Sequence, residues 1–227
     1  MNMWCMPSPL EAITIATDLP EKLSTELAAR GSHRRDGCAF APELSYGRHC
    51  GPAPHIARPA AVVILLFCRN GRWYIPLTVR HAALGKHGGQ ISLPGGAVDP
   101  GESSADAARR ELAEELGVCP SVELLGQLSE CYVYVSDFRV TPWLAVTRDE
   151  PVWQPHDCEV ERVVEMPLDT LLNPSCRGTT NIERGPLAFS APCWQLGDDC
   201  VWGATSIILG ELAGVLQRLA NGTDHHD

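Results

Sequence analysis

The sequence predicts an α/β protein built around a mixed β-sheet, and three observations favour this class. A short apolar hairpin near residue 70 requires an antiparallel strand pair, which excludes a purely parallel sheet. Several β-like runs follow the hairpin, and two long helical patterns lie between and after them, as in layered α/β folds. The 227 residues, of which 44% are hydrophobic, are enough to bury the core of one sizeable domain.

The chain is expected to divide into three parts. Residues 1–58 are predicted to be a partly irregular N-terminal extension, with one helix at Leu19–Ala29 and a stretch rich in Gly, His, Arg and Pro after it. The core is expected to start near Pro59, and the main domain to span residues 59–220. Residues 221–227 form a polar tail for which no regular structure is predicted.

Hydrophobic periodicity and turn residues predict the elements of the main domain. The turn Arg69-Asn70-Gly71 joins the first two strands, and the first helix is capped by Ser103 with Asp106 and ended by Gly117. The predicted strands are Ala60–Cys68, Trp73–Arg80, Val122–Val133, Phe138–Val146, Glu161–Met166 and Cys193–Trp202, and the predicted helices are Ser104–Leu116 and Ala204–Ala220.

Charge and composition exclude several functional classes. A formal charge of −10 argues against a protein that holds nucleic acid through a basic surface, so the expected partner is a small molecule. The longest apolar run, Ala60–Cys68, is far shorter than the roughly 20 residues of a membrane-spanning helix. Ten scattered cysteines without a CxxC pair favour a reducing compartment, and we therefore expect a cytoplasmic protein. A homodimer is compatible with the sequence.

Three carboxylates share one face of the first predicted helix of the main domain. At roughly 100° per residue, Glu114 and Glu115 lie on either side of Glu111 on the helical wheel. Like charges at this spacing repel, and a bound cation reverses that effect. Oxygen ligands without His or Cys favour Mg²⁺ or Mn²⁺, which points to phosphate-ester or diphosphate chemistry. The alternative, a solvated acidic helix face, is the usual explanation of a bare Glu-rich turn.

The spacing around these acids resembles the Nudix box, G-x5-E-x7-R-E-U-x-E-E-x-G-U, at every fixed position from Gly96 to Val118. A chance match has odds on the order of 10⁻⁷ per chain. The resemblance implies an α/β/α sandwich carrying a catalytic loop-helix-loop.

It also implies a role for each residue of the box. Glu111, Glu114, Glu115 and the Gly96 carbonyl are expected to ligate the metal, and Arg110 and Glu102 to orient those carboxylates. The general base remains open among Glu111, Glu114 and a later loop acid, of which Glu159 is favoured.

The segment from Leu77 to Gly96 resembles a narrower signature, that of the coenzyme A diphosphatase branch of Nudix enzymes. The matching positions are Leu77, Thr78, Arg80, Leu84, His87, Gly89, Gln90, Pro94, Gly95 and Gly96. The departures are His81, Gly85 and Leu93, where the branch usually has Ser, Arg and Phe. Later stretches extend the similarity over roughly residues 59 to 218.

A small basic cluster next to glycines in this segment is predicted to hold substrate phosphate. The expected substrate-binding residues are Arg80, Lys86, His87, Gly89 and Gln90. In the alternative interpretation, Arg80 pairs with an acid of the helix and His87 is only a loop residue. The predicted reaction is hydrolysis of coenzyme A or its derivatives to adenosine 3′,5′-bisphosphate and a 4′-phosphopantetheine species. The alternatives are hydrolysis of ADP-ribose, dinucleotides or nucleoside triphosphates, and a non-catalytic ligand-binding module.

Overall fold

The computed structural model describes residues 8–30, 39–41, 53–54, 56–81, 88–117, 121–156, 158–184 and 187–222. The helices are α1 Pro9–Ile15, α2 Leu19–Arg30, α3 Ser104–Leu116 and α4 Ala204–Gly222, with 3-10 turns η4 Leu168–Leu171 and η5 Pro174–Cys176. The strands are β1 Arg58–Arg69, β2 Arg72–Arg80, β3 Ile91–Ser92, β4 Gly95–Ala97, β5 Val122–Gln127, β6 Cys131–Val133, β7 Phe138–Thr147, β8 Val160–Pro167, β9 Arg177–Arg184, β10 Leu187–Leu196 and β11 Asp199–Trp202.

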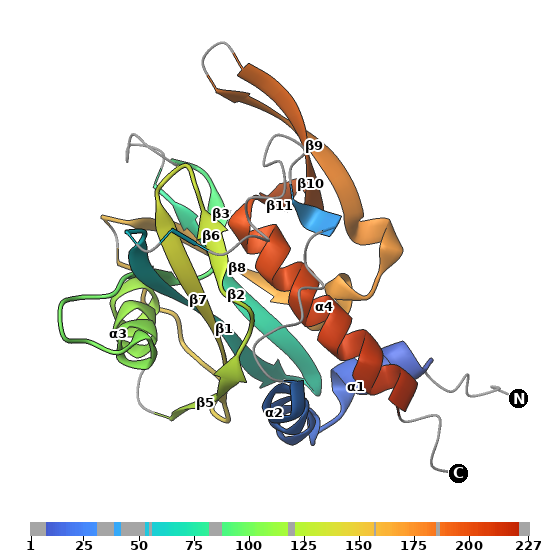
Figure 1. Cartoon of the computed structure of the whole chain (residues 1–227). Helices are drawn as coiled ribbons and strands as arrows, with labels where there is room; N and C mark the ends of the chain where they lie inside the picture. Colours follow the sequence, from blue (N-terminus) through green and yellow to red (C-terminus); the bar gives the residue numbers. More distant parts are fainter. Residues whose placement is uncertain are drawn as a thin grey trace, which may run out of the picture.

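Eight strands form a mixed sheet, as the sequence predicts. Its main order is β3-β2-β1-β7-β5, with β4 paired to β1, β6 to β7 and β8 to β2. Strands β1 and β7 run parallel from Arg58 opposite Phe138 to Leu66 opposite Val146, and the other pairs are antiparallel. Helices α3 and α4 lie on opposite sides of this sheet, so the architecture is α/β/α (Figure 1).

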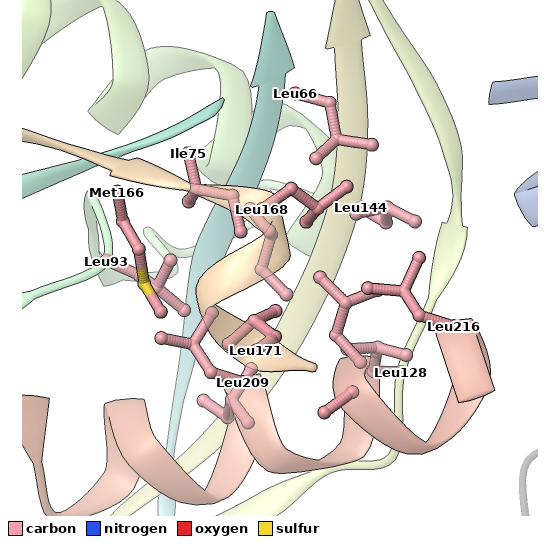
Figure 2. Packing of buried hydrophobic residues seen from close by; sticks show 14 of the residues in the cluster. Leu66, Ile75, Leu93, Leu128, Leu144, Met166, Leu168, Leu171, Leu209 and Leu216 are labelled. Carbon is pink, nitrogen blue, oxygen red and sulfur yellow. The ribbon is translucent and has the colours of Figure 1, made fainter. Parts of the chain in front are cut away.

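Strand β1 is buried on both faces because its side chains alternate between two cores. Ala61, Val63 and Leu65 pack with Leu112 and Leu116 of α3. The intervening side chains belong to the larger core on the α4 side, namely Ala60, Val62, Ile64 and Leu66. In Figure 2, Leu209 and Leu216 of α4 lie opposite sheet residues such as Leu66 and Leu144. The continuous apolar run that predicts a buried strand therefore serves both faces of the sheet.

The turn between β1 and β2 is the predicted hairpin, closed by Arg69 opposite Arg72. Its two central residues, Asn70 and Gly71, have φ of 52° and 75°. This left-handed backbone is the geometry that an Asn-Gly pair favours in a two-residue hairpin.

The N-terminal helices, which precede the expected start of the main domain near Pro59, pack into the larger core. Leu19 and Leu23 of α2 are fully buried. The Trp73 indole donates to the Ala16 carbonyl oxygen at 2.9 Å, and Arg218 Nε of α4 lies 3.1 Å from Glu26 Oε1. The polar segment that separates these helices from β1 concealed their packing at the level of sequence.

A second, three-stranded sheet of order β11-β10-β9 projects from the body (Figure 1). The sequence predicts one strand at Cys193–Trp202, but the structure has a hairpin there, in which β10 turns at Gly197 into β11. The predicted strand Val122–Val133 is likewise divided into β5 and β6. Among the described helices, none has the length and hydropathy needed to cross a bilayer.

A Leu23→Ala substitution tests whether α2 is an integral part of the core. Because Leu23 is fully buried, we expect the variant to lose about 2–5 kcal/mol of unfolding free energy in urea titrations. The matched control is Leu10→Ala, whose side chain is exposed on α1. A loss below about 1 kcal/mol for Leu23→Ala would contradict the integral role of this helix.

Candidate active site

Helix α3 has both of the predicted end signals. The Ser103 side chain accepts a hydrogen bond from the Asp106 amide at 3.2 Å, which satisfies a free N–H of the first turn. Gly117 adopts φ 65° and its N–H donates to the Ala113 carbonyl, which ends the helix. Trp143 of β7 donates to Ser104 Oγ at 3.2 Å, so the start of α3 is also tied to the sheet.

Arg110 connects the acids at the exposed edge of α3. Its Nε and Nη2 donate to the two carboxylate oxygens of Glu102, each at 3.0 Å. Its Nη1 donates to Glu111 at 2.8 Å and to Glu114 at 3.1 Å, and Nη2 also reaches the Ala97 carbonyl at 2.9 Å. These hydrogen bonds raise the pKa of Arg110 and lower that of Glu102, so both groups stay ionised.

Gly96 allows the carboxylate of Glu111 to approach β4. A Cβ placed on Gly96 would lie 2.3 Å from Glu111 Oε1, so any larger residue would displace this side chain. Burial raises the pKa of Glu111, although the Arg110 guanidinium acts in the opposite direction. The short strand β4 therefore brings a backbone segment directly against the first acid of the helix.

Glu115 points into the protein rather than along the exposed edge, with an exposed fraction of 5%. Thr78 Oγ1 lies 3.4 Å from its Oε2, and the Gly95 amide also donates to it. Burial, assisted by the negative charge of Glu111, raises the pKa of Glu115 to about 7. The sequence predicts that all three acids lie at the exposed edge of the helix. In the structure, however, Glu115 is buried next to Thr78 of β2 and Gly95 of β4.

The donor set suits a hard divalent cation, because it consists of carboxylate oxygens beside a backbone carbonyl. Within the described residues, however, no three Asp, Glu, His or Cys side chains converge closely enough to hold a metal. Glu111 and Glu114 both hydrogen-bond to Arg110, while Glu115 accepts a hydrogen bond from the Gly95 amide.

Arg80 and Glu159 lie close to the buried end of this cluster. The positive charge of Arg80 lowers the pKa of Glu115, whereas the charge of Glu159 raises it. The backbone joins the two residues through the His81 amide, which donates to the Glu159 carbonyl at 2.9 Å. Arg80 therefore influences Glu115 electrostatically, but among the described residues no ion pair joins Arg80 to an acid of α3, and Arg80 also lines a cavity.

The remaining predicted substrate-binding residues differ in their placement. The Gln90 carbonyl accepts a hydrogen bond from the Arg80 amide at 3.0 Å, and Gln90 also lines the cavity. Gly89 donates its amide to the Arg80 carbonyl at 2.8 Å. Lys86 and His87 lie outside the described residues.

The cavity has a volume of about 430 Å³, and Arg80 and Gly95 are among the residues that line it. Its lining is mostly apolar and includes Phe138, Phe189 and Trp202. Sequence reasoning assigned no site role to these residues. Trp202 stands in a stretch that resembles the coenzyme A branch, which is a partial signal. No sequence pattern indicated a site role for Phe189, because only the folding of the β9–β10 hairpin brings this residue to the cavity.

Comparison with known proteins shows the family to which the chain belongs. Residues 57–182 match the NUDIX domain, and the chain therefore belongs to the Nudix hydrolase family, whose members act on pyrophosphate bonds and generally use divalent metal ions. A Caenorhabditis elegans protein, Nudix hydrolase 3, is 35% identical over 139 residues, which cover 60% of this chain and 57% of that protein. NudL of Pectobacterium atrosepticum, described as an uncharacterized Nudix hydrolase, is 34% identical over 161 residues, covering 70% of this chain and 83% of NudL.

Solved structures of this family are similar at low identity. A MutT/nudix family protein from Enterococcus faecalis is 19% identical with a TM-score of 0.48, over 89% of this chain and 75% of that one. A MutT protein from Methanosarcina mazei is 15% identical with a TM-score of 0.46, over 73% and 94% of the two chains.

Burial of Glu115 predicts a pH-dependent stability of the metal-free protein. Its folded pKa of about 7 lies above the ordinary 4.5, so its ionisation destabilises the fold progressively as pH rises from 4.5 through 7. Glu115→Gln should therefore stabilise the protein by about 2–3 kcal/mol at pH 8, and by less than about 1 kcal/mol at pH 5.

Urea unfolding in EDTA at the two pH values measures this difference. Glu161→Gln, an exposed position on β8, is the matched control and should unfold like the parent protein at both. Equal stability of Glu115→Gln and the parent at pH 8 would show that Glu115 carries no burial penalty.

Proposed function

We propose that the chain hydrolyses the diphosphate bond of coenzyme A or its derivatives, giving adenosine 3′,5′-bisphosphate and a 4′-phosphopantetheine species. The observation that carries the proposal is that Arg80 lines a mostly apolar cavity and also acts electrostatically on Glu115 of α3. This arrangement suits a substrate with a diphosphate at one end and a large uncharged group beyond it. The match of the Leu77–Gly96 segment to the coenzyme A branch supports the same substrate.

The proposed metal is Mg²⁺ or Mn²⁺, with Glu111, Glu114, Glu115 and the Gly96 carbonyl as ligands. When bound, it supplies neutralisation of the diphosphate oxygens and a more acidic water. The elevated pKa values of Glu111 and Glu115 support this assignment, because clustered and partly buried carboxylates favour a cation between them. The donor chemistry of these residues thus fits a hard divalent cation.

Residues of the chain perform the remaining tasks in this proposal. Arg110 and Glu102 keep the ligands of α3 in position through their paired hydrogen bonds. Arg80 binds a diphosphate oxygen, together with Gln90 and with Lys86 and His87 from the adjoining segment. Gly89 holds Arg80 in place, because its amide donates to the Arg80 carbonyl. Glu159 accepts the proton of the attacking water, a role that its proximity to Glu111 and Glu115 supports.

Product analysis tests the reaction directly. The protein is incubated with Mg²⁺ or Mn²⁺ and, in parallel, with coenzyme A, ADP-ribose and NADH, and products are identified by mass spectrometry. We expect adenosine 3′,5′-bisphosphate from coenzyme A ahead of turnover of the other two. Glu114→Gln should lower kcat at least about 100-fold, since it removes a ligand charge, whereas the exposed Glu123→Gln should not.

Each other outcome has a definite meaning. Rapid cleavage of ADP-ribose or NADH without coenzyme A cleavage would show that the enzyme hydrolyses a different diphosphate substrate by the same chemistry. Binding of nucleotides without turnover of any of them would favour a ligand-binding module and would contradict the catalytic assignment.

Replacement of Arg80 tests the phosphate role. Loss of the guanidinium in Arg80→Ala should raise KM for coenzyme A about tenfold or more, because a charge-assisted hydrogen bond to phosphate is removed. Arg72→Ala, at the exposed start of the same strand, is the matched control and should keep the parent KM. An unchanged KM in Arg80→Ala would instead assign Arg80 solely to its interaction with Glu115.

A further inference from the structure

The cavity that Arg80 lines is mostly apolar. Besides Arg80 and Gln90, its lining includes apolar and aromatic side chains such as Val140, Phe138 and Phe189. Among the described residues that line it, Arg80 is the one with a charged side chain. An uncharged group is stable in such a cavity, while a phosphate buried there would lose hydration without gaining a partner.

This lining discriminates between the two halves of coenzyme A. The nucleoside half carries a 3′-phosphate besides the diphosphate, so it would place a charged group inside a mostly apolar cavity. The pantetheine half is neutral, and its thioester derivatives end in an apolar acyl chain. The apolar interior therefore suits the pantetheine arm and its acyl group.

Part of the cavity wall comes from residues beyond the NUDIX match, which ends at residue 182. Phe189 lies on β10, Trp202 ends β11, and Ala204 begins α4. The fold holds this wall in place at two points. Trp194 is fully buried, stacks on Phe40 at 4.3 Å between ring centroids, and donates to the Ser206 carbonyl at 3.4 Å.

The second point joins the hairpin to the main sheet. Arg162 of β8 forms a two-pronged ion pair with Asp199 of β11, in which Nη1 lies 3.0 Å from Oδ2 and Nη2 lies 2.5 Å from Oδ1. Arg162 is opposite Val79, next to Arg80 along β2. A preformed wall of this kind limits the depth of the cavity and hence the length of a group that it accepts.

We propose that this cavity is an acyl subsite, in which Phe189, Trp202 and Ala204 set the acyl-chain length that the enzyme prefers. The inference rests on the proposed coenzyme A activity and adds a preference for acyl thioesters over free coenzyme A. Each methylene that enters the cavity contributes about 0.8 kcal/mol, which corresponds to roughly fourfold in kcat/KM.

The test is a chain-length series with the full-length protein and Mg²⁺, using free coenzyme A and its acetyl, butyryl, hexanoyl and octanoyl thioesters. We expect kcat/KM to rise by up to about fourfold per methylene and then to level off when the cavity is full. A flat series, with free coenzyme A hydrolysed equally well, would overturn the acyl subsite and leave the proposed reaction intact. Absence of hydrolysis throughout the series would overturn the proposed reaction itself.

Two variants act in opposite directions on the same wall. Phe189→Ala removes part of the wall and should lower the octanoyl-to-free coenzyme A ratio of kcat/KM about tenfold. Ala204→Leu fills the cavity and should move the preferred acyl group to a shorter chain. Ser190→Ala, an exposed neighbour on β10, is the control and should keep the parent series.

Thermal unfolding of each variant establishes whether it is folded. If Phe189→Ala is not folded, the shift in preferred chain length in Ala204→Leu tests the proposal. Equal losses of kcat/KM for free coenzyme A and octanoyl-coenzyme A in Phe189→Ala would overturn the proposal, because the cavity would then hold a group common to both substrates.

Discussion

The geometry of the site depends on one guanidinium. Arg110 contacts Glu102 in the loop before α3, the Ala97 carbonyl of β4, and two acids of the helix itself. It therefore compensates like charges that would otherwise repel on one helix face, and it ties that face to the neighbouring loop. Lysine could not replace it, because a single ammonium group lacks the planar fork that joins these partners.

Burial of Glu115 is the second constraint on the site, and it works against the stability of the fold. The carboxylate lies among residues of the sheet end, with Thr78 and the Gly95 amide as its polar contacts, and its pKa rises accordingly. The two cores on either side of the sheet stabilise the scaffold that holds this unfavourable charge. A local destabilisation at a functional position of this kind is a familiar feature of enzymes.

The carboxylate cluster and part of the cavity wall are built from different elements of the fold. The acids lie on α3, which packs on one face of the sheet, while part of the cavity wall comes from β10, β11 and α4 on the other side of β1 (Figure 1). Arg80 belongs to both regions because it ends β2, the strand next to β1. Variation of the β9–β11 sheet could therefore alter the bound group without disturbing the carboxylate cluster.

The sequence alone determined those features of the protein that depend on interactions between residues close together in the chain. The ends of α3 coincide with the prediction because Ser103 and Gly117 act on backbone groups within one helical turn. The Asn70-Gly71 hairpin and the carboxylate face of α3 are local in the same sense. Contacts between distant residues decided the rest. The burial of Glu115, the packing of α2 and the place of Phe189 each depend on segments far apart in the chain, and a periodic pattern records that a side chain is apolar or charged but not which distant surface it meets.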